Sequence, residues 1–375
     1  MSWFALGALA AWLGLVFTNG GYWRMNQRLP VTAGEQVRWP SVVAVVPARD
    51  EAAILPDTLP SLLRQDYPGD FRVIVVDDAS TDGTGDVAKQ LGDIHVVIGS
   101  GPPAGWTGKV AALATGVDAA GEPDYLLFTD ADIAHPPDSV RELVRAAADR
   151  DMVSLMARLR TDTFWERAIV PAFVYFFAQL YPFARVNRVD RRTAAAAGGC
   201  VLVRRATLVA AGGLAEIRGA LIDDVALASL IKRRGSGRIW LGLSTSVRSL
   251  RAYPRLADLW DMVARSAYDQ LRYSPALLAG TVLGLLELYA VPPVLGIIGL
   301  LTGQWLTAAL GLTGWAVMAG SYLPMLRRYG LSVAWAPLLP VVALLYVGMT
   351  VDSAWRHRQG RGGEWKGRTA RDRES

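Results

Sequence analysis

The stretch Phe71–Thr84 reads FRVIVVDDASTDGT and contains the change of pattern that decides the fold. Its first six residues are mostly apolar and β-branched, without the alternation of a half-exposed strand, which predicts a buried strand of a parallel sheet. Two aspartates follow at the strand end, and a turn closes at Gly83 before a helix that we expect to run through Leu91. The stretch therefore predicts one strand–turn–helix unit of an α/β protein.

The same pattern recurs on both sides of this stretch. Ser41–Val46 (SVVAVV) is expected to form a buried strand, and Ala52–Gln65 a helix with its leucines on one side. Two further strands are expected at His95–Ile98 and Tyr125–Phe128, with a helix between them. Strands that alternate with helices predict a doubly wound sheet whose crossovers are right-handed.

Three of the expected strands end in carboxylates. Asp50 and Glu51 follow the first strand, the pair at 77–78 follows the second, and the segment 130–132 follows the fourth. In doubly wound sheets ligands bind at the carboxyl ends of the strands. We therefore expect these side chains to converge on one crevice.

The apolar residues are unevenly distributed, with long runs at both ends of the chain. Trp3–Thr18 is uninterrupted, and the basic residues Arg24 and Arg28 come after it. A signal peptide carries its basic residues before the apolar run, so residues 1–23 are interpreted as an uncleaved membrane anchor whose C-terminal side faces the cytosol. Residues 275–353 are expected to form a second membrane region, because three runs there have bilayer length: Ala276–Thr302, Trp305–Leu326 and Leu331–Val351.

The two ends give conflicting predictions about topology. If a domain at 38–253 is cytosolic, three C-terminal spans would place the tail, residues 354–375, outside. That tail is rich in arginine, which the positive-inside rule places in the cytosol. Either one of the proline-bearing C-terminal segments does not cross, or the tail breaks the rule.

Charge and rare residues exclude several classes of function. The net charge is +5, but the basic residues lie beside apolar runs and in the tail, so nucleic-acid binding is not expected. The single cysteine, Cys200, excludes an internal disulfide, and the three histidines are scattered along the chain. Any metal is therefore expected to be a hard cation bound by carboxylates and phosphates.

Four motifs in this order resemble the family 2 glycosyltransferases, which use the nucleotide-sugar fold called GT-A. They are VVPARDEAAI (45–54), VVDDASTDGT (75–84), FTDADI (128–133) and LIDDVAL (221–227). More narrowly, GWTGKVAALATG (105–116), GGCVLVRR (198–205) and the flanking apolar runs resemble hopanoid-associated and carotenoid-glycosylating transferases. The resemblance covers residues 40–250 and implies an inverting enzyme of the bacterial inner (cytoplasmic) membrane, multi-pass with a cytosolic catalytic domain. It would move a sugar from a nucleotide-diphosphate sugar, with a UDP-sugar the first candidate, to a lipid such as a hopanoid or other isoprenoid.

Asp130 and Asp132 are the candidate metal ligands. Sugar transfer leaves negative charge on the departing phosphates, which a divalent cation stabilises. Mg²⁺ and Mn²⁺ prefer oxygen ligands and often take one or two of them from protein. The resemblance to the family's DxD motif implies that Asp132 is the direct ligand and that Asp130 faces the ribose or the metal. The structural alternative is a helix cap and a turn residue.

Other strand ends supply candidates for the nucleotide. Asp77 and Asp78 would accept hydrogen bonds from the imide N–H of uracil and from ribose hydroxyls, although either could instead form an Asx-turn. Pro47, Arg49 and Glu51 would line the same pocket, with a helix N-cap as the alternative.

Lys109 follows Gly108 at an expected helix start, where a cation suits phosphate; a solvated lysine is the alternative. Asp223 and Asp224 are expected on a polar break before the helical run Val225–Ile231. The acceptor hydroxyl needs a general base, and the family's acidic motif implies Asp224, with Asp223 as the other candidate. First-turn acids stabilised by the helix dipole are the alternative.

The QxxRW motif of processive family members is missing from the sequence, which argues against a processive polysaccharide synthase. The most similar residues are Arg265 and the segment 270–273 (QLRY), where Arg265 or Arg272 could contact the diphosphate.

Two segments are candidates for membrane contact near the acceptor. Phe164–Phe183 is unusually aromatic, and Glu166 and Pro171 argue against a full span, so an interfacial helix or packing against the domain's own core is expected. Residues 254–274 have apolar residues at helical spacing and predict one amphipathic interfacial helix.

Several alternatives remain open on sequence alone. The acceptor could be a polyprenyl phosphate, another glycolipid or a polysaccharide. The protein could also be a membrane-anchored nucleotide-sugar binding protein without transfer activity, although such a protein would not need both Asp132 and Asp224. A transporter is disfavoured because the strand-rich middle is too large for a loop between transport helices.

Overall fold

The computed structural model describes residues 1–30 and 38–362, so most of the expected basic tail lies outside the described residues. The chain divides into two compact units. The helical unit contains Met1–Met25, Thr161–Ala184, Tyr253 and the described residues after it. The α/β unit contains the described residues of 26–160 together with 185–252.

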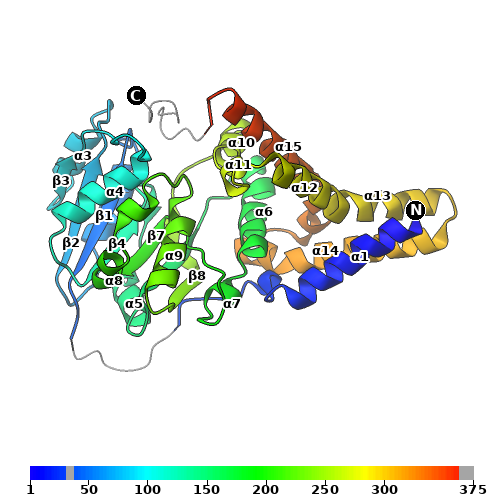
Figure 1. The fold of residues 1–375 in the computed structure, drawn as a ribbon, viewed down its shortest axis with the longest axis horizontal. Helices are drawn as coiled ribbons and strands as arrows, with labels where there is room; N and C mark the ends of the chain where they lie inside the picture. The colour runs from blue at the N-terminus through cyan, green and yellow to red at the C-terminus, as the bar shows by residue number, and fades with distance from the viewer. Residues whose placement is uncertain (31–37, 363–375) are drawn as a thin grey trace. The chain divides into compact units, whose positions relative to one another are not determined.

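The α/β unit is built on one eight-stranded mixed sheet (Figure 1). Its order is β3-β2-β1-β4-β7-β6-β8-β5, in which β1 to β4 are mutually parallel and β7 runs antiparallel to both neighbours. The strands are β1 (Val42–Ala48), β2 (Phe71–Asp77), β3 (His95–Ile98), β4 (Tyr125–Thr129), β5 (Ile133–Ala134), β6 (Met152–Arg158), β7 (Cys200–Arg204) and β8 (Ile239–Ser249). The expected α/β fold is confirmed, and its sheet is mixed.

Helices cover both faces of the parallel half of the sheet, which explains its continuous apolar strands. Val42, Ala44 and Val46 point to the face that packs with α2 (Leu55–Leu63) and α5 (Ser139–Ala146). Val45 and Val76 point to the other face, where α4 lies against them. Gly116 of α4 allows this approach, because a Cβ there would lie 2.3 Å from the Val45 side chain. The remaining helices are α3 (Thr84–Gln90), α4 (Gly108–Ala119), α7 (Phe183–Val186), α8 (Arg205–Ala210), the 3₁₀ turn Leu214–Ile217 and α9 (Asp223–Arg234).

The helical unit contains most of the apolar sequence. In Figure 1, α1, α13 and α14 run side by side. The elements are α1 (Ser2–Thr18), the 3₁₀ turn Tyr22–Arg24, α6 (Phe164–Leu180), α10 (Leu256–Ala264), α11 (Ala267–Gln270), α12 (Pro275–Leu285), a π-helical segment (Leu286–Ala290), α13 (Val291–Leu301), α14 (Trp305–Tyr329), the 3₁₀ turn Val333–Leu338 and α15 (Leu339–Arg358).

Small residues set the distance between α13 and α14. A Cβ on Gly299 would lie 2.4 Å from the backbone nitrogen of Ala308, and one on Gly311 would lie 2.4 Å from that of Gly296. Glycine at such positions lets two helix backbones touch, as is common between membrane helices.

Four helical stretches among the described residues are long and apolar enough to cross a membrane: Phe164–Val186, Pro275–Leu301, Trp305–Tyr329 and Val333–Arg358. The last three coincide with the three C-terminal runs expected from the sequence. The expected N-terminal anchor forms a helix of 17 residues, Ser2–Thr18, which is shorter than these four.

The two residues that argued against a span in Phe164–Phe183 have local explanations in the structure, and whether the segment spans a membrane stays a prediction. Pro171 does not interrupt α6, and Glu166 is part of the helix cap: its Oε2 accepts from the backbone N–H of Thr163 at 2.9 Å, while its own N–H donates to Thr163 Oγ1 at 3.2 Å. Tyr175, in the middle of α6, packs edge-on against Tyr322 of α14. Much of this aromatic segment is thus part of the core of the helical unit.

The prediction of a single amphipathic helix at 254–274 is wrong. The segment forms two short helices, α10 and α11, with a break at Arg265–Ser266. Contacts with α15 hold each piece separately: Trp260 Nε1 donates to Asp352 Oδ2 at 2.8 Å, and the N–H of Tyr268 donates to Ser353 Oγ at 3.0 Å. These tertiary contacts override the helical periodicity of the sequence.

Candidate active site

A small cleft, partly open to solvent, lies at the carboxyl ends of β1 and β4. Pro47 from β1 and Thr129 from β4 form part of its wall, and α4 and α9 each direct their first turn into it. The charged residues that line the cleft are Lys109, Asp130, Asp223 and Asp224. The structure therefore brings together five residues that the sequence analysis selected from four separate segments.

Lys109 joins two of these segments. Its Nζ lies 2.8 Å from Asp130 Oδ1, after β4, and 3.4 Å from Asp223 Oδ2, at the start of α9. Burial opposes the charge of this lysine, but the neighbouring carboxylates of Asp130, Asp223 and Asp224 outweigh it and raise the pKa of Lys109 above its ordinary value. Lys109 is thus a permanent cation held between acidic groups, and the alternative of a solvated surface lysine is wrong.

Asp224 is held by backbone donors on both carboxylate oxygens. Oδ2 accepts from the N–H of Gly198 and Oδ1 from the N–H of Val225, each at 2.8 Å. Burial and the adjacent Asp223 raise the pKa of Asp224 to about 6, although Lys109 and the two N–H donors act in the opposite direction. A carboxylate with a pKa near neutrality suits a general base. Asp223 and Asp224 are the first two residues of α9, so they do not lie before the helix as expected.

Gly198 belongs to the site but was not selected from the sequence. It lies two residues before β7, whose first residue pairs with Thr129 at the end of β4. A Cβ on Gly198 would lie 3.1 Å from Lys109 Nζ and 3.3 Å from Asp224 Oδ2. The Gly-Gly pair before Cys200 is the only sequence signal for this close approach.

Asp132 lies in a second group of charges beside the cleft. Its Oδ2 accepts a hydrogen bond from Ser249 Oγ and lies 3.7 Å from Nε of Arg251. Arg251 also reaches Glu51, with 2.6 Å between Nη2 and Oε1. Burial raises the pKa of Asp132, which Asp130 and Glu51 raise further and Arg251 opposes.

Ser249 and Arg251 were missed because β8 was not predicted. β8 is parallel to β6, and β6 and β4 both run antiparallel to β7, so β8 ends at the same edge of the sheet as β4. A predicted strand at 239–249 would have placed both residues at the crevice.

The residues present fit a divalent cation. Glu51, Asp130 and Asp132 are close enough for the first two to raise the pKa of the third, so three carboxylates lie near one another there. No group of three or more His, Cys, Asp or Glu side chains with metal-binding geometry occurs in the described residues. Mg²⁺ and Mn²⁺ often take one or two carboxylates from protein and their other ligands from phosphate and water. Asp130 and Asp132 are of that ligand type, and their binding of a cation stays a prediction.

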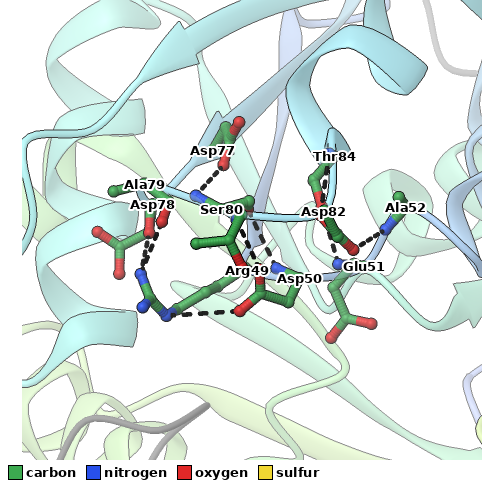
Figure 2. A network of polar contacts seen from close by, with 11 residues as sticks. Arg49, Asp50, Glu51, Ala52, Asp77, Asp78, Ala79, Ser80, Asp82 and Thr84 are labelled. Atoms are coloured by element: carbon green, nitrogen blue, oxygen red, sulfur yellow. Dashed lines mark hydrogen bonds and ion pairs between the residues drawn. The ribbon is translucent and has the colours of Figure 1, made fainter.

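The turns after β1 and β2 are joined by a polar network (Figure 2). Nη1 of Arg49 donates to the backbone oxygens of Asp78 and Ala79 at 2.6 and 3.0 Å. Asp50 Oδ1 accepts from the N–H of Thr81 at 2.8 Å. Asp77 Oδ1 accepts from the N–H of Ser80 at 2.9 Å, a local side-chain bond to the turn like that of the Asx-turn alternative, but three residues on instead of two. Of these residues none lines the cleft, and a contact of Asp77 or Asp78 with the base or ribose stays a prediction.

His135 is a buried structural residue next to the site. Its Nε2 lies 2.9 Å from Thr129 Oγ1 and its Nδ1 lies 3.1 Å from Ser139 Oγ. Burial lowers the pKa of His135 to about 4, so the ring is neutral near pH 7. It positions the end of β4, next to Asp130.

Arg265 and Arg272 belong to the helical unit, and their contact with a diphosphate also stays a prediction.

Comparison with known proteins matches part of the chain to one family. Residues 43–209 match the family model for Glycosyl transferase family 2. A "Probable glycosyltransferase YdaM" from Bacillus subtilis (strain 168) is 32% identical over 116 residues, which is 30% of this chain; the chain spans 27% of that relative's length.

Solved structures are similar over larger parts of the chain. A mannosyltransferase from Pyrobaculum calidifontis, solved in complex with GDP-Man and Mn²⁺, has a TM-score of 0.56 at 20% identity, over 94% of this chain and 99% of its own. A glucosyl-3-phosphoglycerate synthase from Mycobacterium tuberculosis has a TM-score of 0.42 at 23% identity, over 62% and 80%. The first likeness shows the fold. Residues 43–209 thus match family 2 of the glycosyltransferases, and the chain shares the GT-A fold.

Proposed function

We propose that this protein transfers a sugar from a nucleotide-diphosphate sugar to a membrane lipid, with inversion at the anomeric carbon. The observation that carries the proposal is the meeting of Lys109, Asp130, Asp223 and Asp224 in one cleft at the strand ends of a family 2 domain. An attacking hydroxyl, a base and a phosphate-binding cation are the groups that such a transfer needs together.

Each group has a role in the proposed reaction. Asp224 accepts the proton of the acceptor hydroxyl, since its carboxylate is held in place by two backbone N–H groups and has a pKa near neutrality. Lys109 supplies a fixed positive charge that offsets negative charge on the diphosphate. Asp130 and Asp132 would hold a divalent cation, which when bound stabilises the departing phosphates as a Lewis acid.

The donor is proposed to be a UDP- or GDP-sugar. The similar mannosyltransferase was solved with GDP-Man and Mn²⁺, and the turns after β1 and β2 supply buried carboxylates of the kind that accept from bases and ribose hydroxyls. Neither observation selects the base, so both nucleotides belong in the test.

A lipid acceptor is favoured because the same chain contains four helical stretches long and apolar enough to cross a membrane. We propose that these stretches do so in a bacterial inner membrane. A hopanoid or other isoprenoid lipid is the first candidate, on the resemblance of segments 105–116 and 198–205. A polyprenyl phosphate or another glycolipid is the second.

The test uses the full chain purified in detergent. It is incubated with UDP- and GDP-sugars, Mn²⁺ or Mg²⁺ and a bacterial lipid extract that includes hopanoids and polyprenyl phosphates. Nucleotide release and new glycolipids are followed by mass spectrometry. Asp224→Asn and Asp132→Ala are compared with Asp93→Asn, an exposed aspartate of the same unit.

A lipid that gains one sugar from one donor, with wild-type yield in Asp93→Asn and none in the other two variants, is the expected result. Nucleotide release without a lipid product would overturn the lipid acceptor. Donor binding without turnover under every condition would overturn the transferase and leave a nucleotide-sugar binding protein.

A further inference from the structure

Arg251 lies between two carboxylates that come from different turns of the sheet. Its Nη2 is 2.6 Å from Glu51 Oε1, in the turn after β1, and its Nε is 3.7 Å from Asp132 Oδ2, in the turn after β4. Arg251 itself follows β8. One guanidinium thus connects three strand ends at the edge of the sheet where the proposed donor binds.

The carboxylates at this edge need positive charge. Asp132 is buried, and both Asp130 and Glu51 act on it as like charges. Lys109 pairs with Asp130 and Asp223, whereas Arg251 is the cation that acts on Asp132. In this structure the place next to Asp132 that suits a divalent cation is therefore served by a side chain of the protein.

A divalent cation and Arg251 cannot keep the same relation to Asp132. The cation would bind a carboxylate oxygen directly, and the guanidinium would then be a like charge within a few ångströms of it, in a buried site where charges are poorly screened. Glu51 would lose part of its interaction with Arg251 if that side chain moved away. The negative charge of the donor's diphosphate would offset the repulsion between the metal and Arg251. It would also give Arg251 a new partner in place of Glu51.

We propose that Arg251 is an internal counter-cation that competes with the divalent metal for Asp132, so that the metal binds together with the nucleotide diphosphate and not before it. This inference rests on the proposed metal-assisted transfer. It assigns to Arg251 a positioning role, because it acts through the carboxylate of Asp132 and not on the reacting atoms.

The test measures metal binding without donor and without turnover. Free Mn²⁺ is followed by its room-temperature electron paramagnetic resonance signal while Mn²⁺ is titrated into the full chain in detergent. Wild-type protein is expected to bind Mn²⁺ weakly alone and at least tenfold more tightly with UDP or GDP present. In Arg251→Gln, Mn²⁺ alone is expected to bind tenfold or more tightly than in wild type, the size of effect that a like charge within 4–6 Å has on ionisation.

Three variants control the measurement. Arg248→Gln removes an exposed arginine from β8, the strand that Arg251 follows, and is expected to leave Mn²⁺ binding unchanged. Arg251→Lys keeps the charge and is expected to bind Mn²⁺ as weakly as wild type. Adding Asp132→Asn to Arg251→Gln is expected to abolish the gain. A cooperative thermal transition establishes that each variant is folded.

Unchanged Mn²⁺ affinity in Arg251→Gln would overturn the inference, as would tight Mn²⁺ binding by wild type without nucleotide; the second result needs no variant to fold. Because the readout is metal binding, a higher Mn²⁺ affinity in Arg251→Gln supports the inference even if no sugar is transferred. If sugar is transferred but the Mn²⁺ affinity of Arg251→Gln is unchanged, only the proposed role of Arg251 is overturned.

Discussion

The backbone N–H of Gly198 donates to Oδ2 of Asp224 over 2.8 Å, and this bond links the entry of β7 to the first turn of α9. This bond holds the carboxylate that we propose as the base at the start of β7, and so restricts the rotamers of the Asp224 side chain. The residue that donates has no side chain, and the space that a Cβ would take is filled by Lys109 and Asp224.

Gly198→Ala is therefore expected to reduce transfer about tenfold to hundredfold, because misplacing a catalytic group by a few tenths of an ångström to 1 Å has effects of this order. The new Cβ would push against Lys109 Nζ at 3.1 Å and Asp224 Oδ2 at 3.3 Å. Steady-state rates at saturating donor measure the effect. Gly219→Ala is the control, since its Cβ would meet only a backbone oxygen at 3.5 Å; an equal loss in both variants would contradict the role of Gly198.

Removal of the lysine charge should shift the pH dependence as well as the rate. Lys109 lowers the pKa of Asp224, so Lys109→Met is expected to raise the pKa that limits activity and to weaken donor binding. Lys109→Arg, which keeps the charge, should retain more of both. Rates from pH 5 to 9 and donor binding by calorimetry test this. An unchanged pH profile in Lys109→Met would show that Lys109 does not influence the pKa of Asp224.

The wild-type rate is expected to fall below about pH 6, because the base must be ionised and the pKa of Asp224 is raised to about 6. A general base contributes about 10²- to 10⁴-fold to the rate, so Asp224→Asn should lose at least this factor in kcat. The fall in rate below pH 6 should also disappear in this variant. The measurement is kcat against pH with a saturating donor. A wild-type limb near pH 4 would assign the base to another residue.

Asp224 should also make stability depend on pH. Its folded pKa lies above the unfolded value of 3.8, so the folded state binds more protons between pH 3.8 and 6, and wild-type stability decreases as pH rises through that window. The Asn side chain does not ionise. The melting temperature of Asp224→Asn relative to wild type is therefore expected to increase from pH 4 to pH 7, and a constant difference would show that the carboxyl is not buried in its charged form.

The α13–α14 contact gives a prediction for the helical unit. A Cβ on Gly311 would lie 2.4 to 2.8 Å from backbone atoms of Gly296 and Pro292, so Gly311→Val must separate the two helices. Overpacking of this kind typically costs about 1–3 kcal/mol. Thermal unfolding in detergent is the measurement. Gly320→Val on the same helix, where nothing lies within 4 Å, should behave almost as wild type.

The local pattern of the sequence was enough to predict the parallel half of the sheet. Apolar β-branched runs such as Phe71–Val76 are buried on both faces, and their ends have to carry the polar groups. The cleft around Lys109, Asp130 and Asp224 follows from those ends.

The other half depends on long-range pairing that no local pattern contains. Cys200 pairs with Thr129 because β7 enters antiparallel between β4 and β6, and this brings Gly198 to Asp224. Arg251 reaches Asp132 only because β8 joins the same sheet. α6 is a different case, because Glu166 bonds to Thr163 only three residues away, and T-x-x-E before an apolar run is a local helix-cap signal that the sequence contains.

The segment Thr161–Ala184 separates the two parts of the α/β unit in the chain and belongs to the helical unit. During synthesis, α6 leaves the ribosome before β7 and β8, and long before Ser321 of α14, to which Tyr175 is hydrogen-bonded at 2.6 Å. The central strand β7 likewise arrives after both of its neighbours, β4 and β6. Neither unit can therefore fold completely until later parts of the chain have been synthesised. Until then, the aromatic helix α6 and the unpaired edge of β4 stay exposed in the nascent chain.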